Sequence, residues 1–286
     1  MAVDLLIVGA AKCGTSSLLA YLGQHPGIQP QRQLEMTWFG DPDLNARPFP
    51  DELYFGDSPR DGALRLGKLA GLMYHPDAIA RLHDLSPKVN AVAILCDPVS
   101  RAYSAFCFAR RRGVEPLSRF EEAIAARGQG DWWSDRFRYL EGGTYSTYIQ
   151  DLYDGLGRDS VHVVIFEEFL ANPKAAVGPA LASVGLAPEP LGDEVPRENA
   201  ARSARSGHLA RARRSGGAVA AARHLIPAPA RDALRRQYRK LNESDSAPPP
   251  MDAGTERDLR AHFEEPNREL EQIIGRPIEA WRRPKT

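Results

Sequence analysis

Short, unbroken apolar runs alternate along the chain with segments whose apolar residues recur at helical spacing. The runs are rich in Val, Ile or Leu, have the length of buried strands, and cover residues 5–8, 89–95 and 161–166. Helical spacing is found over residues 74–86, 118–127, 144–156, 173–185 and 254–274. This alternation predicts an α/β protein with a three-layer parallel sheet, covered by helices on both faces, and a helical C-terminal region. Residues 40–66, rich in Asp, Pro and Gly, predict an irregular surface excursion.

The composition is that of an ordinary globular protein. A chain of 286 residues can bury one large core, so we expect a single domain over residues 1–286. The 37 Lys and Arg balance the 37 Asp and Glu, which argues against nucleic acid as a partner. No apolar run approaches about 18 residues and the chain starts directly on a strand, so we expect no membrane span and no signal peptide. No sequence pattern specifies an oligomeric state.

The cysteines favour a reducing environment. Cys13, Cys96 and Cys107 lack metal-ligand spacing, and an odd number does not suggest a disulfide framework. We therefore expect a cytoplasmic protein without a bound metal.

Positive charge is concentrated in one segment. Residues 197–240 contain twelve Lys or Arg against two acids. The segment fits either a solvated helical face or a flexible basic lid over a polyanionic ligand, because three glycines interrupt any helix. A proline-rich linker over residues 246–250 leads from it to the closing helix expected over residues 254–274.

The stretch between the first strand and the first helix predicts a phosphate cradle. It runs from Gly9 to Gly14, and Thr15, Ser16 and Ser17 follow it. Glycines let backbone N–H groups turn toward one point, and the new helix directs its positive end there. Lys12 adds a full charge, in an order (G-x-x-K-x-G-T-S) that differs from the G-x-x-x-x-G-K-[ST] of nucleoside triphosphatases. The alternative is an ordinary glycine turn with a solvated lysine.

Two residues are candidates for a general base. Glu35 lies just before the aromatic pair Trp38 and Phe39, in a short segment that we expect to be extended and near the loop. A carboxylate held against aromatic surface can be poised as a base, whereas the alternative is a solvated loop acid. His25 stands beside a Pro-Gly pair, where a histidine is more often a turn or cap residue.

Four separated stretches resemble the sulfotransferases that use 3′-phosphoadenosine 5′-phosphosulfate (PAPS). The loop GAAKCGTSSL is similar to their 5′-phosphosulfate motif, and QLEMTWF is similar to the K-E-x-x-F-F segment of heparan sulfate and related bacterial sulfotransferases. CDPVSRAYSAF resembles the 3′-phosphate motif R-D-P-x-x-R-A-Y-S, and residues 258–281 resemble the helix that closes many bacterial members. Asn199 with Arg205 and Ser206 matches an N-x-x-x-x-x-R-S stretch common in those members.

The resemblance implies roles for individual residues. It implies a PAPS site formed by Lys12, Cys13, Gly14, Thr15, Ser16, Ser17, Cys96, Ser104 and Arg205. It also implies that Glu35 is the general base and that Lys12 stabilises the charge on the leaving phosphate, with no metal required.

Two positions depart from the family pattern. Cys96 stands where the 3′-phosphate motif has its first arginine, and residues 67–74 lack the acid and the Ser/Thr-Pro pair that members usually carry. Arg101 and Arg205 are candidates for supplying the missing charge.

The sequence therefore predicts a cytoplasmic O-sulfotransferase that moves a sulfuryl group from PAPS to a hydroxyl of a small molecule, of the kind typical of secondary metabolism. One alternative is a degenerate member that binds nucleotide or anion without transfer, or has been repurposed for another reaction. The other is a P-loop kinase, which the missing G-K-[ST] order and the lack of a placed Mg²⁺-binding acid disfavour.

Overall fold

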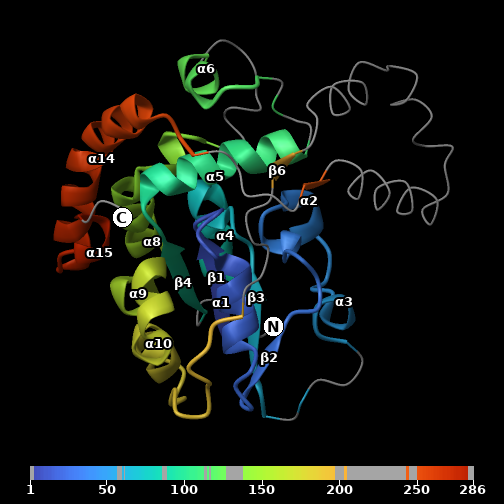
Figure 1. Ribbon diagram of the computed structural model, residues 1–286. Helices are drawn as coiled ribbons and strands as arrows, with labels where there is room; N and C mark the ends of the chain where they lie inside the picture. The colour runs from blue at the N-terminus through green and yellow to red at the C-terminus, as the bar shows by residue number, and fades with distance from the viewer. Residues whose placement is uncertain are drawn as a thin grey trace, which may run out of the picture. The chain divides into compact units, whose positions relative to one another are not determined.

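β1 (Leu5–Gly9) is the central strand of a five-stranded sheet in the computed structural model of the protein (Figure 1). The strand order is β2-β3-β1-β4-β5, and every neighbouring pair is parallel. The other strands are β2 (Ile28–Pro30), β3 (Leu64–Lys68), β4 (Asn90–Leu95) and β5 (Val161–Ile165). The three strands expected from apolar runs are thereby confirmed, as is the parallel α/β class.

The structure describes residues 3–56, 60, 62–85, 89–112, 115, 117–126, 138–196, 203–204, 243–244 and 250–282. The chain divides into two compact units. The sheet unit contains residues 1–98, 144–199 and 262–286, and the second unit contains residues 99–143 and 200–261. That the chain is one domain stays a prediction.

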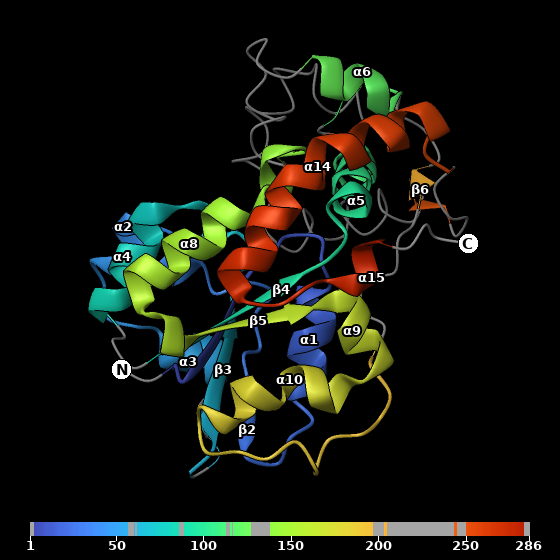
Figure 2. The same ribbon diagram turned by 90° about the vertical axis from the view of Figure 1, so that its left-hand side faces the viewer.

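Helices cover both faces of the sheet. Leu6 and Val8 of β1 pack into one layer and Leu5 and Ile7 into the other, because successive side chains of a strand point to opposite faces. The layer with Leu5 contains α1 (Thr15–Leu22), α9 (Phe166–Ala171) and α10 (Pro173–Ala182) (Figure 2). The opposite layer contains α3 (Asp51–Phe55), α4 (Pro76–Leu85) and α8 (Tyr145–Leu156). The predicted three layers are thus present in the sheet unit.

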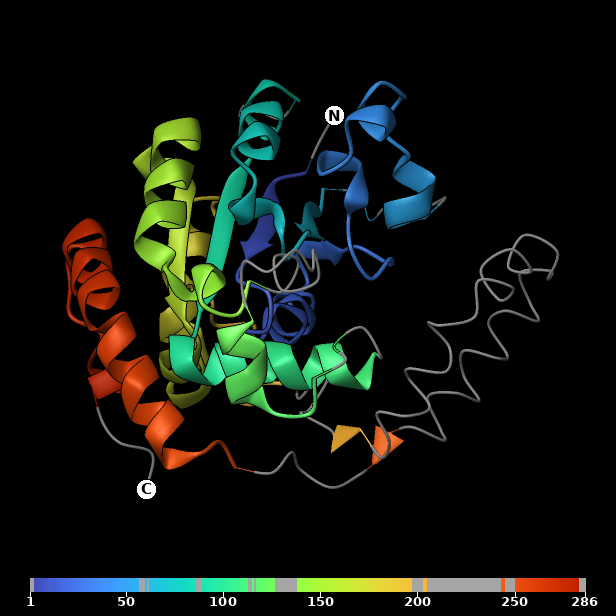
Figure 3. The same cartoon turned by 90° about the horizontal axis from the view of Figure 1, so that it is seen from above.

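α4 and α8 lie side by side in their layer (Figure 3). An aromatic contact joins them, because the ring of Tyr74, just before α4, meets the ring of Tyr148 on α8 edge to face, with centroids 4.9 Å apart. Both helices begin and end within two residues of their expected limits.

The expectation of an irregular excursion over residues 40–66 is wrong in part. The short helices α2 (Pro42–Asn45) and α3, and the first residues of β3, lie in this stretch. β3 pairs with β1 at Leu66 and Leu5, so it is an interior strand. Its sequence, LRLGK, alternates apolar and polar residues over only five positions and therefore lacks the continuous apolar run by which β4 and β5 were recognised.

The remaining elements are short or belong to the second unit. The second unit contains most of α5 (Pro98–Arg111), α6 (Phe120–Ala125), η3 (Glu141–Gly143), the antiparallel pair β6 (Ser203–Ala204) and β7 (Glu243–Ser244), and the first part of α14 (Ala253–Ile274). The sheet unit also contains η1 (Thr37–Phe39), η2 (Leu72–Tyr74), η4 (Arg158–Ser160) and α15 (Glu279–Arg282). The predicted basic lid and proline-rich linker lie outside the described residues, except for residues 203–204 and 250. Across the described ranges, no helix is both long and apolar enough to cross a membrane.

Candidate active site

The predicted phosphate cradle joins β1 to α1 at the carboxyl end of the central strand. The Ala10 N–H donates to the Ile94 carbonyl of β4 at 2.7 Å, and the Cys13 N–H donates back to the Ala10 carbonyl at 3.1 Å. α1 then begins at Thr15, and no described side chain caps its first turn. The loop therefore lies where open α/β sheets bind ligands, with the positive end of a helix directed toward it.

Two loop residues have left-handed backbone conformations. Their φ angles are 78° at Lys12 and 85° at Gly14. A Cβ atom added to Gly14 would lie 2.4 Å from a ring carbon of Phe166, the first residue of α9. Glycine is thus required at position 14 for both backbone and steric reasons, whereas Lys12 adopts a conformation that costs a non-glycine residue about 1–2 kcal/mol.

Gly14→Ala is expected to lower the free energy of unfolding by at least about 1–2 kcal/mol, because the backbone penalty alone has this size. Urea denaturation measures the change. Gly178→Ala is the matched control, because Gly178 lies in α10 and no described atom is within 4 Å of an added Cβ. There alanine should stabilise by about 0.5–1 kcal/mol. Equal stability of Gly14→Ala and wild type would contradict the loop geometry.

A disulfide joins the loop to β4. Cys13 and Cys96 are bonded, with their Cα atoms 5.2 Å apart, and Cys107 is not part of a disulfide. The expectation that the cysteines do not pair is therefore wrong. The pair was hidden because its members are 83 positions apart in sequence and approach each other only because β4 lies next to β1. The hydroxyl of Tyr145 on α8 donates to the Cys96 carbonyl at 2.9 Å and lies 3.3 Å from the Cys13 sulfur.

Neither Cys96 nor Arg101 is a convincing replacement for the arginine of the 3′-phosphate motif. The Cys96 sulfur is bonded to another sulfur and carries no positive charge. Arg101 is only 1% exposed, and within the second unit its guanidinium donates to the carbonyls of Arg138 and Tyr139. Burial, and then the neighbouring Glu115 carboxylate, raise the pKa of Tyr139, so its phenol stays neutral. We therefore interpret Arg101 as a structural residue of that unit.

Glu35 lies beside the loop, and a lysine that the sequence analysis did not single out connects the two. Lys68 is the last residue of β3 and is 2% exposed. Its Nζ atom donates to Glu35 Oε1 at 2.7 Å and to Ser16 Oγ at 3.3 Å. Glu35 Oε2 accepts the Ala70 N–H at 2.9 Å, and 31% of the side chain is exposed. The Glu35 carboxylate is thus held by the Lys68 ammonium and the Ala70 N–H. The sequence suggested either a base poised against aromatic surface or a solvated loop acid, and neither describes this arrangement.

The main chain fixes Lys68 in this position. Its N–H donates to the side-chain oxygen of Gln31, and its carbonyl accepts the Met36 N–H, both at 2.7 Å. The segment that carries Glu35 is therefore bonded to the end of β3. Because a buried ammonium is costly unless it is paired, Lys68 and Glu35 stabilise each other.

His25 lies at the other end of α1 and is buried. Its Nδ1 accepts the Gly27 N–H at 3.0 Å, and its Nε2 is 3.1 Å from the Ala187 carbonyl, to which it donates. Both ring nitrogens are thus used within the turn. The interpretation of His25 as a turn residue is confirmed.

Comparison with known proteins decides the family. No family model matches the chain. A crystal structure of a sulfotransferase from Alicyclobacillus acidocaldarius is similar over 98% of both chains, with 26% identity and a TM-score of 0.66. The chain belongs to the sulfotransferase family.

Two curated proteins are similar to parts of this sulfotransferase. Both are described as bifunctional heparan sulfate N-deacetylase/N-sulfotransferase 1. The protein from Caenorhabditis briggsae is 22% identical over 183 residues, or 59% of the chain, and that from Caenorhabditis elegans is 30% identical over 108 residues, or 36% of the chain. The matches span only 21% and 12% of those relatives.

The other predicted site residues of the sulfotransferase lie in different parts of the chain. Thr15 and Ser17 are buried in the first turn of α1. Ser104 is half-buried on α5, in the second unit. Arg205, together with Asn199 and Ser206, lies outside the described residues. Among the described side chains, no group of three or more His, Cys, Asp or Glu is arranged to hold a metal.

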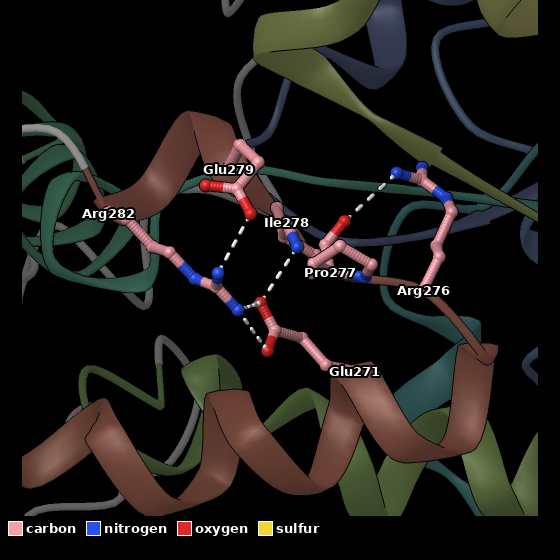
Figure 4. A network of polar contacts seen from close by, with 6 residues as sticks. All are labelled: Glu271, Arg276, Pro277, Ile278, Glu279 and Arg282. Carbon is pink, nitrogen blue, oxygen red and sulfur yellow. Dashed lines mark hydrogen bonds and ion pairs between the residues drawn. The ribbon is translucent and has the colours of Figure 1, made fainter.

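The C-terminal segment of the sulfotransferase fixes the turn after β4. Arg282 donates to the carboxylates of Glu271 and Glu279, and Glu271 also accepts the Ile278 N–H at 2.7 Å (Figure 4). Arg276 forms two 2.8 Å contacts with the carboxylate of Glu168.

This network places Trp281 of α15 against Glu167. The Trp281 indole N–H donates to Glu167 Oε2 at 2.9 Å, and Glu167 Oε1 accepts the Asp97 N–H at 3.0 Å. The Trp281 ring also packs on Tyr145, which holds the Cys96 carbonyl. The turn at residues 96–97 is thus held from two sides by side chains that sequence patterns do not reveal.

Proposed function

We propose that this sulfotransferase moves a sulfuryl group from PAPS to a hydroxyl of a small-molecule acceptor. The observation that supports this most is the contact of one buried ammonium, Lys68, with both the loop hydroxyl of Ser16 and the carboxylate of Glu35. It brings an anion cradle and a candidate base side by side. With equal numbers of acidic and basic residues, the chain as a whole has no net positive charge that would attract a polyanionic acceptor such as heparan sulfate.

The residues present suit the donor. Lys12, the first N–H groups of α1 and the hydroxyls of Thr15, Ser16 and Ser17 would hold the 5′-phosphosulfate by charge-assisted hydrogen bonds. Ser104 and Arg205 remain proposed contacts of the 3′-phosphate.

The transfer follows from these positions. Glu35 accepts the proton of the acceptor hydroxyl as its oxygen bonds to the sulfur, and the bond between the sulfur and the bridging phosphate oxygen breaks. Adenosine 3′,5′-bisphosphate leaves, and Lys12 stabilises the charge that grows on its 5′-phosphate. Lys68 orients the Glu35 carboxylate, whose remaining lone pairs are available to the hydroxyl.

Lys68→Met is expected to lower kcat by about 10–100-fold, because a base displaced by about 1 Å loses activity on this scale. Binding of adenosine 3′,5′-bisphosphate should stay within about threefold of wild type, since Lys12 and the N–H groups of α1 remain and only the Ser16 hydroxyl loses a partner. Lys174→Met is the control, because this half-exposed lysine pairs with Asp193 at the surface. Wild-type kcat in Lys68→Met would contradict the orienting role.

Two measurements test the proposed function. Calorimetry should show that adenosine 3′,5′-bisphosphate binds more tightly than ATP with Mg²⁺. Mass spectrometry should then detect an 80-dalton sulfuryl gain, about the mass of SO₃, when a panel of hydroxylated small molecules is incubated with PAPS and enzyme. Preferential binding of ATP with Mg²⁺ would instead support a kinase and exclude this proposal.

The degenerate alternative is favoured by one observation. Cys96, at the position of the family arginine, is bonded to Cys13 and offers no charge to a 3′-phosphate. Tight binding of the bisphosphate without transfer to any acceptor in the panel would support that alternative.

A further inference from the structure

The Cys13–Cys96 disulfide lies next to the residue that carries the positive charge of the loop. Lys12 directly precedes Cys13 and has a φ of 78°. A lysine keeps such a backbone conformation only where the surrounding structure holds it. The disulfide fixes the adjacent residue to the end of β4 and is therefore a constraint of the required kind.

The two ends of this link differ in how they are held. The Cys96 carbonyl accepts the hydroxyl of Tyr145, and the next N–H, that of Asp97, donates to Glu167. These bonds do not involve sulfur, so they remain when the disulfide is broken. Cys13 is held by its own N–H bond within the loop, by the disulfide, and by a contact of 3.3 Å between its sulfur and the Tyr145 hydroxyl. Reduction therefore removes the covalent link between the loop and β4 and leaves the turn after β4 in place.

We propose that Cys13 and Cys96 are a positioning pair for Lys12, and that their oxidation state sets the affinity of the loop for its anionic ligand. This inference rests on the proposed function of the loop as the donor site. In the disulfide state Lys12 is held in its left-handed conformation, with its ammonium in the cradle. In the dithiol state residues 12–14 relax toward commoner backbone conformations, and the ammonium is in place for only part of the time.

The two states interconvert by thiol–disulfide exchange with a small thiol such as glutathione. A glutathione thiolate attacks one protein sulfur, the S–S bond breaks, and a mixed disulfide and one protein thiolate form. A second glutathione thiolate attacks the glutathione sulfur of the mixed disulfide. The products are two protein thiols and one oxidised glutathione, so two electrons pass to the protein. Because Cys13 and Cys96 are 1% and 6% exposed, exchange requires local opening of the loop and is slow.

Calorimetry with adenosine 3′,5′-bisphosphate tests the inference on the whole chain, oxidised and after long incubation with dithiothreitol. Non-reducing peptide mass spectrometry verifies the state of the pair. Reduction should weaken binding about tenfold, as expected if the competent loop conformation falls to about a tenth of the molecules. Cys13→Ser should bind like the reduced protein in both conditions. Cys107→Ser should respond like wild type, because Cys107 lies on α5 and is not part of the disulfide.

Lys12→Met separates an effect on the lysine from a general effect on folding. It should bind weakly in both states and show no redox response, whereas a response of wild-type size would overturn the role of Lys12. Equal affinity of the oxidised and reduced wild type would overturn the inference and leave the proposed function intact. Failure of the bisphosphate to bind in either state would overturn the proposed function, and the inference with it. Absence of the Cys13–Cys96 peptide from oxidised protein would also overturn the inference.

Discussion

Lys12→Ala is expected to abolish measurable sulfuryl transfer and to weaken binding of adenosine 3′,5′-bisphosphate by roughly ten- to hundredfold. The binding loss follows from the removal of one cation from a loop of N–H donors, where charge-assisted hydrogen bonds contribute about 1.5–3 kcal/mol each. The loss of rate is larger, because the ammonium also stabilises charge that develops only in the transition state, and removing one such group costs about 10²–10³ in kcat. Calorimetry and single-turnover kinetics measure the two effects separately.

Two further variants make this result interpretable. Lys174→Ala removes a half-exposed lysine from the same unit and should leave both quantities unchanged. Lys12→Gly removes the ammonium but suits the φ of 78°, so it should be more stable than Lys12→Ala while equally inactive. Turnover at the wild-type rate in either Lys12 variant would show that the loop is not the donor site.

Glu35→Gln is expected to lower kcat by about 10²–10⁴, the usual range for loss of a general base. Bisphosphate affinity should remain near that of wild type, since the loop is untouched. Both quantities are needed, because a loss of affinity together with kcat would indicate a disturbed loop and not a missing base.

The contact with Lys68 sets the controls for this substitution. A glutamine leaves the buried ammonium without its counter-charge, which can lower stability independently of chemistry. Glu35→Asp keeps the charge and shortens the side chain, so it should fold like wild type and still lose most of its activity. An active Glu35→Gln combined with an inactive His25→Ala would show that the base was assigned to the wrong residue.

The features that the sequence made predictable are those coded by contiguous residues. The strand, glycine loop and helix over residues 5–22 occupy neighbouring positions, so spacing alone specifies this strand–loop–helix unit. The apolar runs of β4 and β5 are equally local, since strands buried on both faces need apolar residues throughout.

The features that were missed depend on pairs of residues distant in sequence. In the sequence, nothing distinguishes Lys68 from an ordinary polar residue. Its ammonium comes to Ser16 and Glu35 because β3 pairs with β1. Cys13 and Cys96 form a pair only once β4 lies on the other side of β1. In each case the strand order determines which side chains come into contact, and no local sequence pattern specifies the strand order.

The central position of β1 also has a consequence for how the chain folds during synthesis. β1 is the first of the five strands to leave the ribosome, yet it pairs with β3 near Leu66 and with β4 near Asn90. Until both have followed, its apolar sequence LLIVG exposes two unpaired edges to solvent and to other nascent chains. Sheets built from such distant pairings form slowly, and their intermediates are prone to aggregation. The yield of folded protein therefore depends on how well this one strand is shielded in the interval, and a chaperone that binds short apolar segments would act there first.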